Sequence, residues 1–227
     1  MEERILLVVA HPDDEVLGFG ATGYKKVKQG AKVKSAILCA NAEVRNLRPS
    51  DNELMSDIQV ANQILGFEEP ILGSFPNIST NTIEHIKLVQ FIEKAIEDFA
   101  PTHIFTHHPK DLNIDHQEVS KACIAAARLF QRRSELPPLK MLAYMEIQSA
   151  TDWAFEGQGD GFRANMYVEI EDCLEKKLEA LRCYRNVMRD YPHPRSDEAM
   201  TGLAAYRGGQ AGQRYSEAFQ LIFQQEI

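Results

Sequence analysis

Two short clusters of histidine and aspartate carry the side chains that could do metal chemistry in this sequence. The first, HPDDE (residues 11–15), follows an apolar run, and the second, HHPKDLNIDH (residues 107–116), begins at the end of the segment THIFTH. Two imidazoles and one carboxylate are a common catalytic zinc set, which leaves positions open for water and substrate. The two clusters therefore predict a hydrolase whose metal ion is bound by His11, Asp14 and His116.

The spacing within each cluster suits a shared ligand. His11 and Asp14 are three residues apart across a turn constrained by Pro12, so both side chains can reach one point. His116 falls in the first turn of a predicted helix whose apolar residues at +3 and +7 direct it toward the sheet. Asp13 and Asp14 would repel each other, and a bound cation is the simplest partner that favours adjacent acids.

Each of these residues also has an ordinary structural interpretation. His11 could simply end a strand, Asp14 could cap the next helix, and His116 could be packed in the core. Asp115, followed three residues later by Glu118, predicts a capping box at the start of the helix that begins at residue 115. The joint pattern favours the metal site over these separate roles.

The elements that must position these residues alternate along the chain. Strands are predicted at residues 4–10, 33–40, near 71, 102–107 and 139–145, and helices at 16–29, 50–65, 82–99 and from 115. This alternation predicts an α/β fold, a Rossmann-like, mostly parallel sheet flanked by helices. Ligands of such sheets bind beyond the carboxyl ends of the strands, where both clusters fall. No third glycine follows Gly18 and Gly20 at the required place, which argues against a dinucleotide site.

The pattern changes in the C-terminal third of the chain. A strand at 166–170 and a charged helix at 171–189 are expected, and the glycine-rich stretch 207–215 looks like a surface loop. We expect one domain over residues 1–227. Its Rossmann-like core (1–150) would carry C-terminal elements (151–227) that contribute to the substrate pocket.

The composition is that of a globular chain with an acidic balance. The 227 residues include 25 basic and 33 acidic side chains, which gives a formal net charge of -8. Nucleic acids and anionic membranes require a basic surface, so neither is expected as the main partner. No apolar stretch reaches about 18 residues and no signal peptide is recognisable, so we expect a cytoplasmic protein without membrane insertion. The four cysteines contain no Cys-x-x-Cys pair and are expected to be reduced.

The segments HPDDEVLGFG (11–20) and DLNIDHQ (111–117) resemble the PIG-L/LmbE-like family of metal-dependent N-acetylglucosaminyl deacetylases. In the tail, HPRS (193–196) and the stretch 207–219 resemble the C-terminal signature of bacterial members. The similarity thus extends over almost the whole chain. It implies hydrolysis of an N-acetylated amino sugar of the GlcNAc type, which could be linked to a nucleotide or be a glycan precursor. It also implies that the protein is a homo-oligomer.

For the site, the resemblance implies that His11, Asp14 and His116 bind the metal ion and that Asp13 is the general base. Zn²⁺ is the expected cofactor, and Fe²⁺ shares the same ligand set. Zinc lowers the pKa of a bound water from 15.7 to about 7 and polarises a carbonyl. Because the lone pairs of Asp14 face the metal ion, Asp13 remains as the base that accepts a proton from the bound water and later delivers it to the leaving amine.

One position departs from the family pattern. Members commonly have a histidine three residues before the second ligand histidine, where it helps to stabilise the oxyanion; here that position is Asn113. An asparagine amide can still donate a hydrogen bond. His193 is the second candidate for this role.

The substrate contacts are predicted from the positions of three arginines. Arg45 and Arg48 follow the second strand at the expected active-site edge, and Arg207 begins the glycine-rich stretch, which could bind an anion. Trp153 could line a sugar-binding wall, although core packing is the simpler role.

Three other functions use the same residues. A metal-dependent amidase acting on a non-sugar or thiol conjugate would keep the site and change the pocket. A metal phosphoesterase usually needs two metal ions and more ligands than these clusters offer. A non-catalytic Rossmann-like binding module would have no need for the intact set of His11, Asp13, Asp14 and His116.

Overall fold

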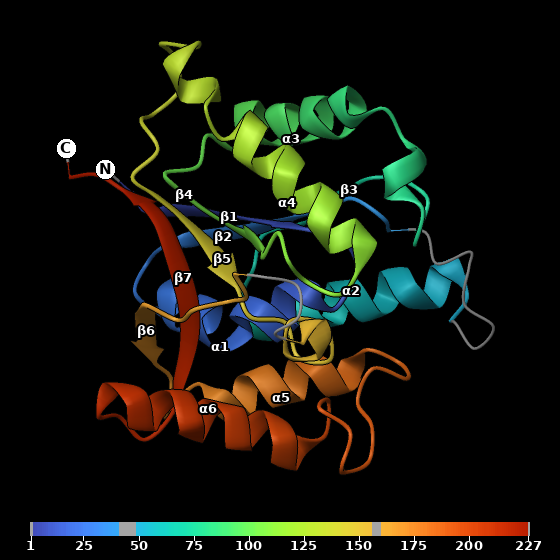
Figure 1. The fold of residues 1–227 in the computed structure, drawn as a ribbon, viewed down its shortest axis with the longest axis vertical. Helices are drawn as coiled ribbons and strands as arrows, with labels where there is room; N and C mark the ends of the chain where they lie inside the picture. Colours follow the sequence, from blue (N-terminus) through green and yellow to red (C-terminus); the bar gives the residue numbers. More distant parts are fainter. Residues whose placement is uncertain (1, 41–48, 156–159, 227) are drawn as a thin grey trace.

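The computed structural model describes residues 2–40, 49–155 and 160–226, and its centre is a seven-stranded sheet (Figure 1). The strand order is β3-β2-β1-β4-β5-β7-β6. The first five strands of this order are parallel, whereas β7 runs antiparallel to β5 and β6. The strands are β1 (Arg4–Val9), β2 (Lys32–Ile37), β3 (Ile71–Leu72), β4 (His103–His107), β5 (Met141–Met145), β6 (Met166–Glu169) and β7 (Ser216–Gln224).

Helices cover both faces of the sheet, with α3 and α4 on one face and α1 and α2 on the other (Figure 1). Helix α5 packs on α1 and α2, and α6 packs on β7 and β6. The longer helices are α1 (Asp14–Lys28), α2 (Asp51–Leu65), α3 (His85–Phe99), α4 (Ile114–Ala126), α5 (Leu174–Cys183) and α6 (Asp197–Ala211). None of the helices in the described ranges is both long and apolar enough to cross a membrane.

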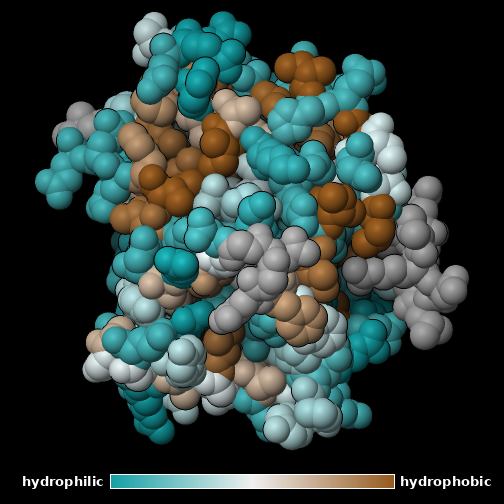
Figure 2. Space-filling model, viewed as in Figure 1, coloured by the Kyte–Doolittle hydropathy of each residue, from teal (hydrophilic) through white to brown (hydrophobic). Residues whose placement is uncertain are grey.

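The apolar run of β1 is explained by burial on both faces. Ile5 and Leu7 belong to the hydrophobic cluster under α1 and α2, whereas Leu6 and Val8 belong to the cluster under α3 and α4. Alternate residues of a strand point to opposite faces, so a strand covered on both faces must be apolar throughout. On the surface, Figure 2 shows hydrophilic side chains over much of one face, with hydrophobic ones in small groups between them.

The fold class predicted from the sequence is confirmed, two local predictions are corrected, and one strand is new. Strand β7 was not predicted, and the helix predicted at 171–189 is shorter, because α5 ends at Cys183. The stretch 207–215 is not all loop, because α6 continues to Ala211 and ends at Gly212 with a φ of 70°. Glycine suits this left-handed helix end. Gly208 lies within α6. A Cβ at this position would lie 2.7 Å from the backbone of Arg214, so only glycine allows the chain to approach this closely.

Candidate active site

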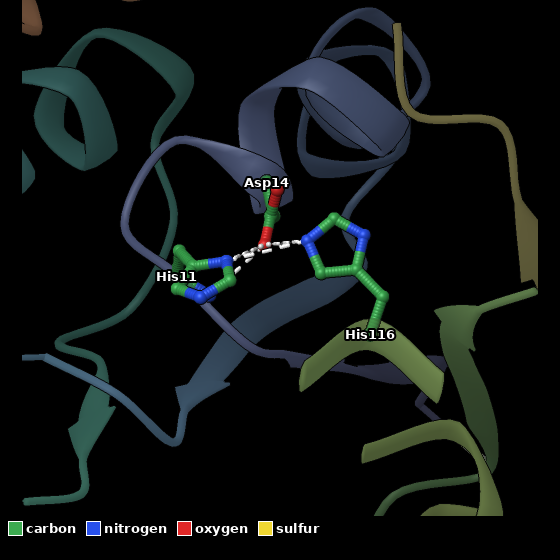
Figure 3. A group of neighbouring side chains, drawn as sticks. All are labelled: His11, Asp14 and His116. Atoms are coloured by element: carbon green, nitrogen blue, oxygen red, sulfur yellow. Dashed lines mark hydrogen bonds and ion pairs between the residues drawn. The ribbon is translucent and has the colours of Figure 1, made fainter. Parts of the chain in front are cut away.

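The two histidine–aspartate clusters meet at one edge of the sheet. β1 and β4 are adjacent parallel strands, so the loop after β1 and the start of α4 both lie beyond their carboxyl ends. The sequence could not establish that these strands are neighbours. In Figure 3 the side chains of His11, Asp14 and His116 point toward one another from the loop after β1, the start of α1 and the first turn of α4.

The three side chains have the geometry of a metal-binding set. Asp14 Oδ2 lies 3.3 Å from His11 Nδ1 and 3.2 Å from His116 Nε2. The two ring nitrogens are 3.2 Å apart. Ligand atoms about 2.1 Å from a shared ion lie about 3.0 Å apart at octahedral angles and about 3.4 Å apart at tetrahedral angles. The residues therefore fit a single divalent ion, and all three are buried.

Carboxylates lie against the other nitrogen of each imidazole. His11 Nε2 is 2.8 Å from Asp115 Oδ2, and His116 Nδ1 is 3.2 Å from Asp111 Oδ1. A carboxylate in this place keeps the ring proton on its own side of the imidazole. With an ion bound, His11 Nδ1 and His116 Nε2 would thereby present their lone pairs to it, as metal ligation requires.

The prediction of a capping box at Asp115 is wrong. The helix cap is Asn113, whose side-chain oxygen accepts a hydrogen bond from the backbone N–H of Asp115 at 2.9 Å. The Asp115 carboxylate instead accepts hydrogen bonds from Ile78 and Thr80 as well as contacting His11. Asp115, His11 and Cys39 also form a possible ligand group, but these hydrogen bonds already occupy the carboxylate of Asp115.

Two stacked histidines have very different pKa values because of their surroundings. His107 and His116 stack with ring centroids 3.8 Å apart. Burial lowers the pKa of His107 to about 3, helped by the charge of His116, so His107 is neutral. Burial also opposes a charge on His116, but the carboxylates of Asp14 and Asp111 overcome it and raise the pKa of His116 to about 10. An ion bound here would have to displace that proton.

Asp13 occupies an unusual backbone conformation beside the metal-binding set. Its φ is 105°, a region that residues other than glycine rarely adopt. Its backbone N–H donates to Glu15 Oε2 at 3.1 Å, and its Oδ2 lies 2.8 Å from Arg195 Nη1. Burial raises the pKa of Glu15 to about 8, so this third acid of HPDDE carries a proton at neutral pH.

A cavity of about 650 Å³ opens over these residues. Asn113 and His193, the two predicted oxyanion-stabilising residues, both line it together with Asp13. Trp153 and Arg189 line it as well, so Trp153 does not belong to the core. The C-terminal segment thus contributes to the cavity wall.

Of the three arginines predicted as substrate contacts, the structure describes Arg207 alone. Arg45 and Arg48 lie outside the described residues. Arg207 lies in α6, does not line the cavity, and its Nε donates to Glu146 Oε2 at 2.9 Å. A substrate contact at Arg207 stays a prediction.

Sequence reasoning missed several residues that complete the site. Asp111 lies within the DLNIDHQ motif, yet nothing in its spacing distinguishes it as the partner of His116. Arg195 lies in the HPRS motif, but its pairing with Asp13 depends on how the C-terminal segment packs. Tyr184, which donates to Glu15, has no sequence signal.

Comparisons with known proteins give a family match. The family model described as PIG-L, GlcNAc-PI de-N-acetylase, matches residues 6–127, which is more than half of the chain. No curated protein matches the sequence.

Solved structures share the fold over nearly the whole chain. The N,N'-diacetylchitobiose deacetylase of Pyrococcus horikoshii has a TM-score of 0.78 at 18% identity, covering 97% of this chain and 84% of the other. The zinc-inhibited teicoplanin deacetylase Orf2 has a TM-score of 0.70 at 15% identity, covering 98% and 99%. GalB, the 4-carboxy-2-hydroxymuconate hydratase of Pseudomonas putida, has a TM-score of 0.75 at 19% identity, covering 99% and 98%. The fold is therefore shared with a hydratase as well as with deacetylases.

Proposed function

The chain belongs to the PIG-L family, and from that premise we propose that it is a metal-dependent N-deacetylase. Its substrate would be an N-acetylated amino sugar of the GlcNAc type or a conjugate of one, nucleotide-linked or a glycan precursor. The observation that carries the proposal is the buried set of His11, Asp14 and His116, with Asp13 beside it in the same cavity.

A divalent ion would be held by His11 Nδ1, Asp14 Oδ2 and His116 Nε2. Such an ion acidifies a water molecule and polarises an amide carbonyl. The expected ion is Zn²⁺, and Fe²⁺ accepts the same imidazole and carboxylate ligands.

Asp13 is assigned the proton transfers. Its carboxylate lines the cavity next to Asp14, whose Oδ2 faces the two ring nitrogens and is not available as a base. Asp13 would accept a proton from the attacking water and deliver it to the amine nitrogen as the amide C–N bond breaks. The products are acetate and the free amino sugar.

Asn113 and His193, which both line the cavity, are our two candidates to donate a hydrogen bond to the developing oxyanion. The Asn113 oxygen accepts the helix-capping hydrogen bond, which leaves the amide N–H₂ as the donor. His193 Nδ1 accepts from the backbone N–H of Arg195 at 3.0 Å, so a neutral His193 carries its proton on Nε2. Burial, together with the charges of Arg195 and Arg189, lowers the pKa of His193 and favours this neutral donor form.

The cavity is large enough for a sugar with a substituent. Its volume of about 650 Å³ lies within the range of about 300–1,000 Å³ that is usual for ligand pockets. Arg45, Arg48 and Arg207 remain our proposed contacts to the substrate, with Arg207 requiring a change of partner from Glu146. A cytoplasmic homo-oligomer without a nucleic-acid partner also remains our expectation.

One observation favours a second candidate, a metal-dependent amidase acting on a non-sugar or thiol conjugate. Ile78 and Leu112 line the cavity and are 44% and 53% exposed, so part of the wall is apolar. An apolar acyl or amine component would bury this surface better than a sugar would.

Metal analysis and an acetate-release assay test the proposal. We expect one equivalent of a divalent ion in the purified protein and acetate release from members of a panel of N-acetylated amino sugars and nucleotide sugars. Release only from N-acylated thiol or non-sugar conjugates would support the second candidate. Hydrolysis of phosphate esters, or no hydrolysis of any amide by the ion-loaded protein, would contradict both.

A further inference from the structure

The carboxylate of Asp13 is held by a residue from the far end of the chain. Arg195 Nη1 lies 2.8 Å from Asp13 Oδ2, across a separation of 182 positions in the sequence. Only 6% of the Asp13 side chain and 15% of the Arg195 side chain are exposed. An ion pair shielded to this extent has a defined geometry, unlike a pair of exposed and flexible side chains.

Arg195 is itself fixed by contacts that do not involve Asp13. Its Nε donates to Ser149 Oγ at 2.7 Å, and its backbone N–H donates to His193 Nδ1 at 3.0 Å. Ser149 and His193 line the same cavity as Asp13. The planar guanidinium therefore donates in two set directions, and it cannot follow Asp13 freely if that side chain moves.

The backbone of Asp13 is supported from the same C-terminal segment. Its N–H donates to Glu15 Oε2 at 3.1 Å, and the hydroxyl of Tyr184 donates to the other oxygen of Glu15. Tyr184 is buried in the core. A φ of 105° is uncommon outside glycine and persists where the surroundings hold it. Residues 184–195 thus hold both the backbone and the side chain of Asp13.

The charge of Arg195 has a further effect. Asp13 and Asp14 are adjacent carboxylates in a buried site, and they repel each other when both are ionised. The guanidinium, 2.8 Å from Asp13 Oδ2, offsets this repulsion. Tyr184 and Arg195 both lie outside residues 6–127, the part of the chain that the family model matches.

We propose that Arg195 is a positioning residue that holds the Asp13 carboxylate in the orientation needed for proton transfer. This inference rests on the proposed function of Asp13 as the general base. Arg195 acts through Asp13 and not directly on the substrate, so its contribution exists only while Asp13 carries a carboxylate. The C-terminal segment therefore supplies part of the catalytic geometry as well as a wall of the cavity.

A double-mutant cycle on the ion-loaded protein tests this. We expect Arg195→Ala to lower kcat by about 100-fold with KM changed less than about threefold, because a misplacement of about 1 Å can cost that much in rate. Arg195→Ala in an Asp13→Asn background should cause no further loss. Arg195→Lys, which keeps the charge, and added guanidinium ion should each restore part of the rate of Arg195→Ala. Arg182→Ala is the matched control, because it removes an arginine that pairs with Glu175 and Asp197 outside the cavity, and it should leave kcat unchanged.

Ion content and thermal stability distinguish positioning from simple loss of folding, and both should stay near those of the unmodified protein in Arg195→Lys. Additive losses in Asp13→Asn and Arg195→Ala would overturn the proposal. A crystal structure of Arg195→Ala gives a readout apart from activity: we expect the Asp13 carboxylate to leave its present position. An unmoved carboxylate would overturn the inference even if no amide substrate is found. Failure of the function itself would appear instead as absence of hydrolysis in the unmodified protein.

Discussion

Two regions of the chain contribute to the site in different ways. The first is residues 6–127, and the second is the described part of the chain after residue 127. The first region supplies the metal-binding set of His11, Asp14 and His116 from segments that follow adjacent parallel strands. The second supplies Arg195 and His193, which reach the same cavity from a loop between α5 and α6. The difference teaches that the capacity to bind an ion is encoded locally, whereas the orientation of the base depends on packing between the two ends of the chain.

The largest expected effect lies in the first region. His116→Ala removes one of three ligands and should abolish both ion binding and hydrolysis, because two remaining ligands bind a divalent ion weakly. Elemental analysis and acetate release measure the two losses. The matched control is His103→Ala, at the start of β4 and outside the cavity, which should retain the ion. Retention of ion and activity by His116→Ala would show that the metal site has been wrongly assigned.

Asp13→Asn separates binding from chemistry within the same loop. We expect kcat to fall by about 1,000-fold, within the range of about 10²–10⁴ that is typical of general acid–base catalysis, while the ion content stays the same. Steady-state kinetics and elemental analysis on one preparation provide both values. Asp57→Asn is the control, because Asp57 is a buried carboxylate of the same cavity that pairs with Arg185. A loss of the ion in Asp13→Asn would mean that Asp13 is a ligand.

Asp111→Asn should weaken ion binding without abolishing hydrolysis. Asp111 Oδ1 lies 3.2 Å from His116 Nδ1, and replacing such a partner usually costs about 10–100-fold in metal affinity. Competition with a chelator measures the affinity, and kcat at saturating ion should approach that of the unmodified protein. Asp98→Asn, on the exposed side of α3, is the control. An unchanged affinity would remove Asp111 from the metal site.

The first region could be predicted well from the sequence because its signals are local. The buried strand β1, the turn at Pro12 and the helical face of His116 each depend on residues within a few positions of one another. The alternation of strands and helices then placed both clusters at one edge of the sheet. The assignment of Asp115 to a capping box failed because its carboxylate is used by His11 and by the distant Thr80.

The second region could not be predicted to the same depth. Nothing near Arg195 in the sequence indicates a pairing with Asp13, since the two residues lie 182 positions apart and meet through tertiary packing. The start and end of α6 have ordinary signals at Ser196 and Gly212, but its glycines look like those of a loop until the close approach of Arg214 is known. Strand β7 likewise depends on its place between β5 and β6.

The smallest expected effect concerns the substrate and compares two arginines of the second region. Arg189 is exposed at the cavity wall, and no ion pair joins it to a carboxylate among the residues that the structure describes. Arg189→Ala should raise KM about threefold for an N-acetylated sugar phosphate and leave KM for the neutral sugar unchanged, because an exposed charge pair contributes about 0.2–1 kcal/mol. High salt should remove the difference, since it screens exposed charges. Arg207→Ala is the comparison, and a larger rise in KM there than in Arg189→Ala would favour the contact predicted from the sequence, with Arg207 leaving Glu146 to bind the substrate.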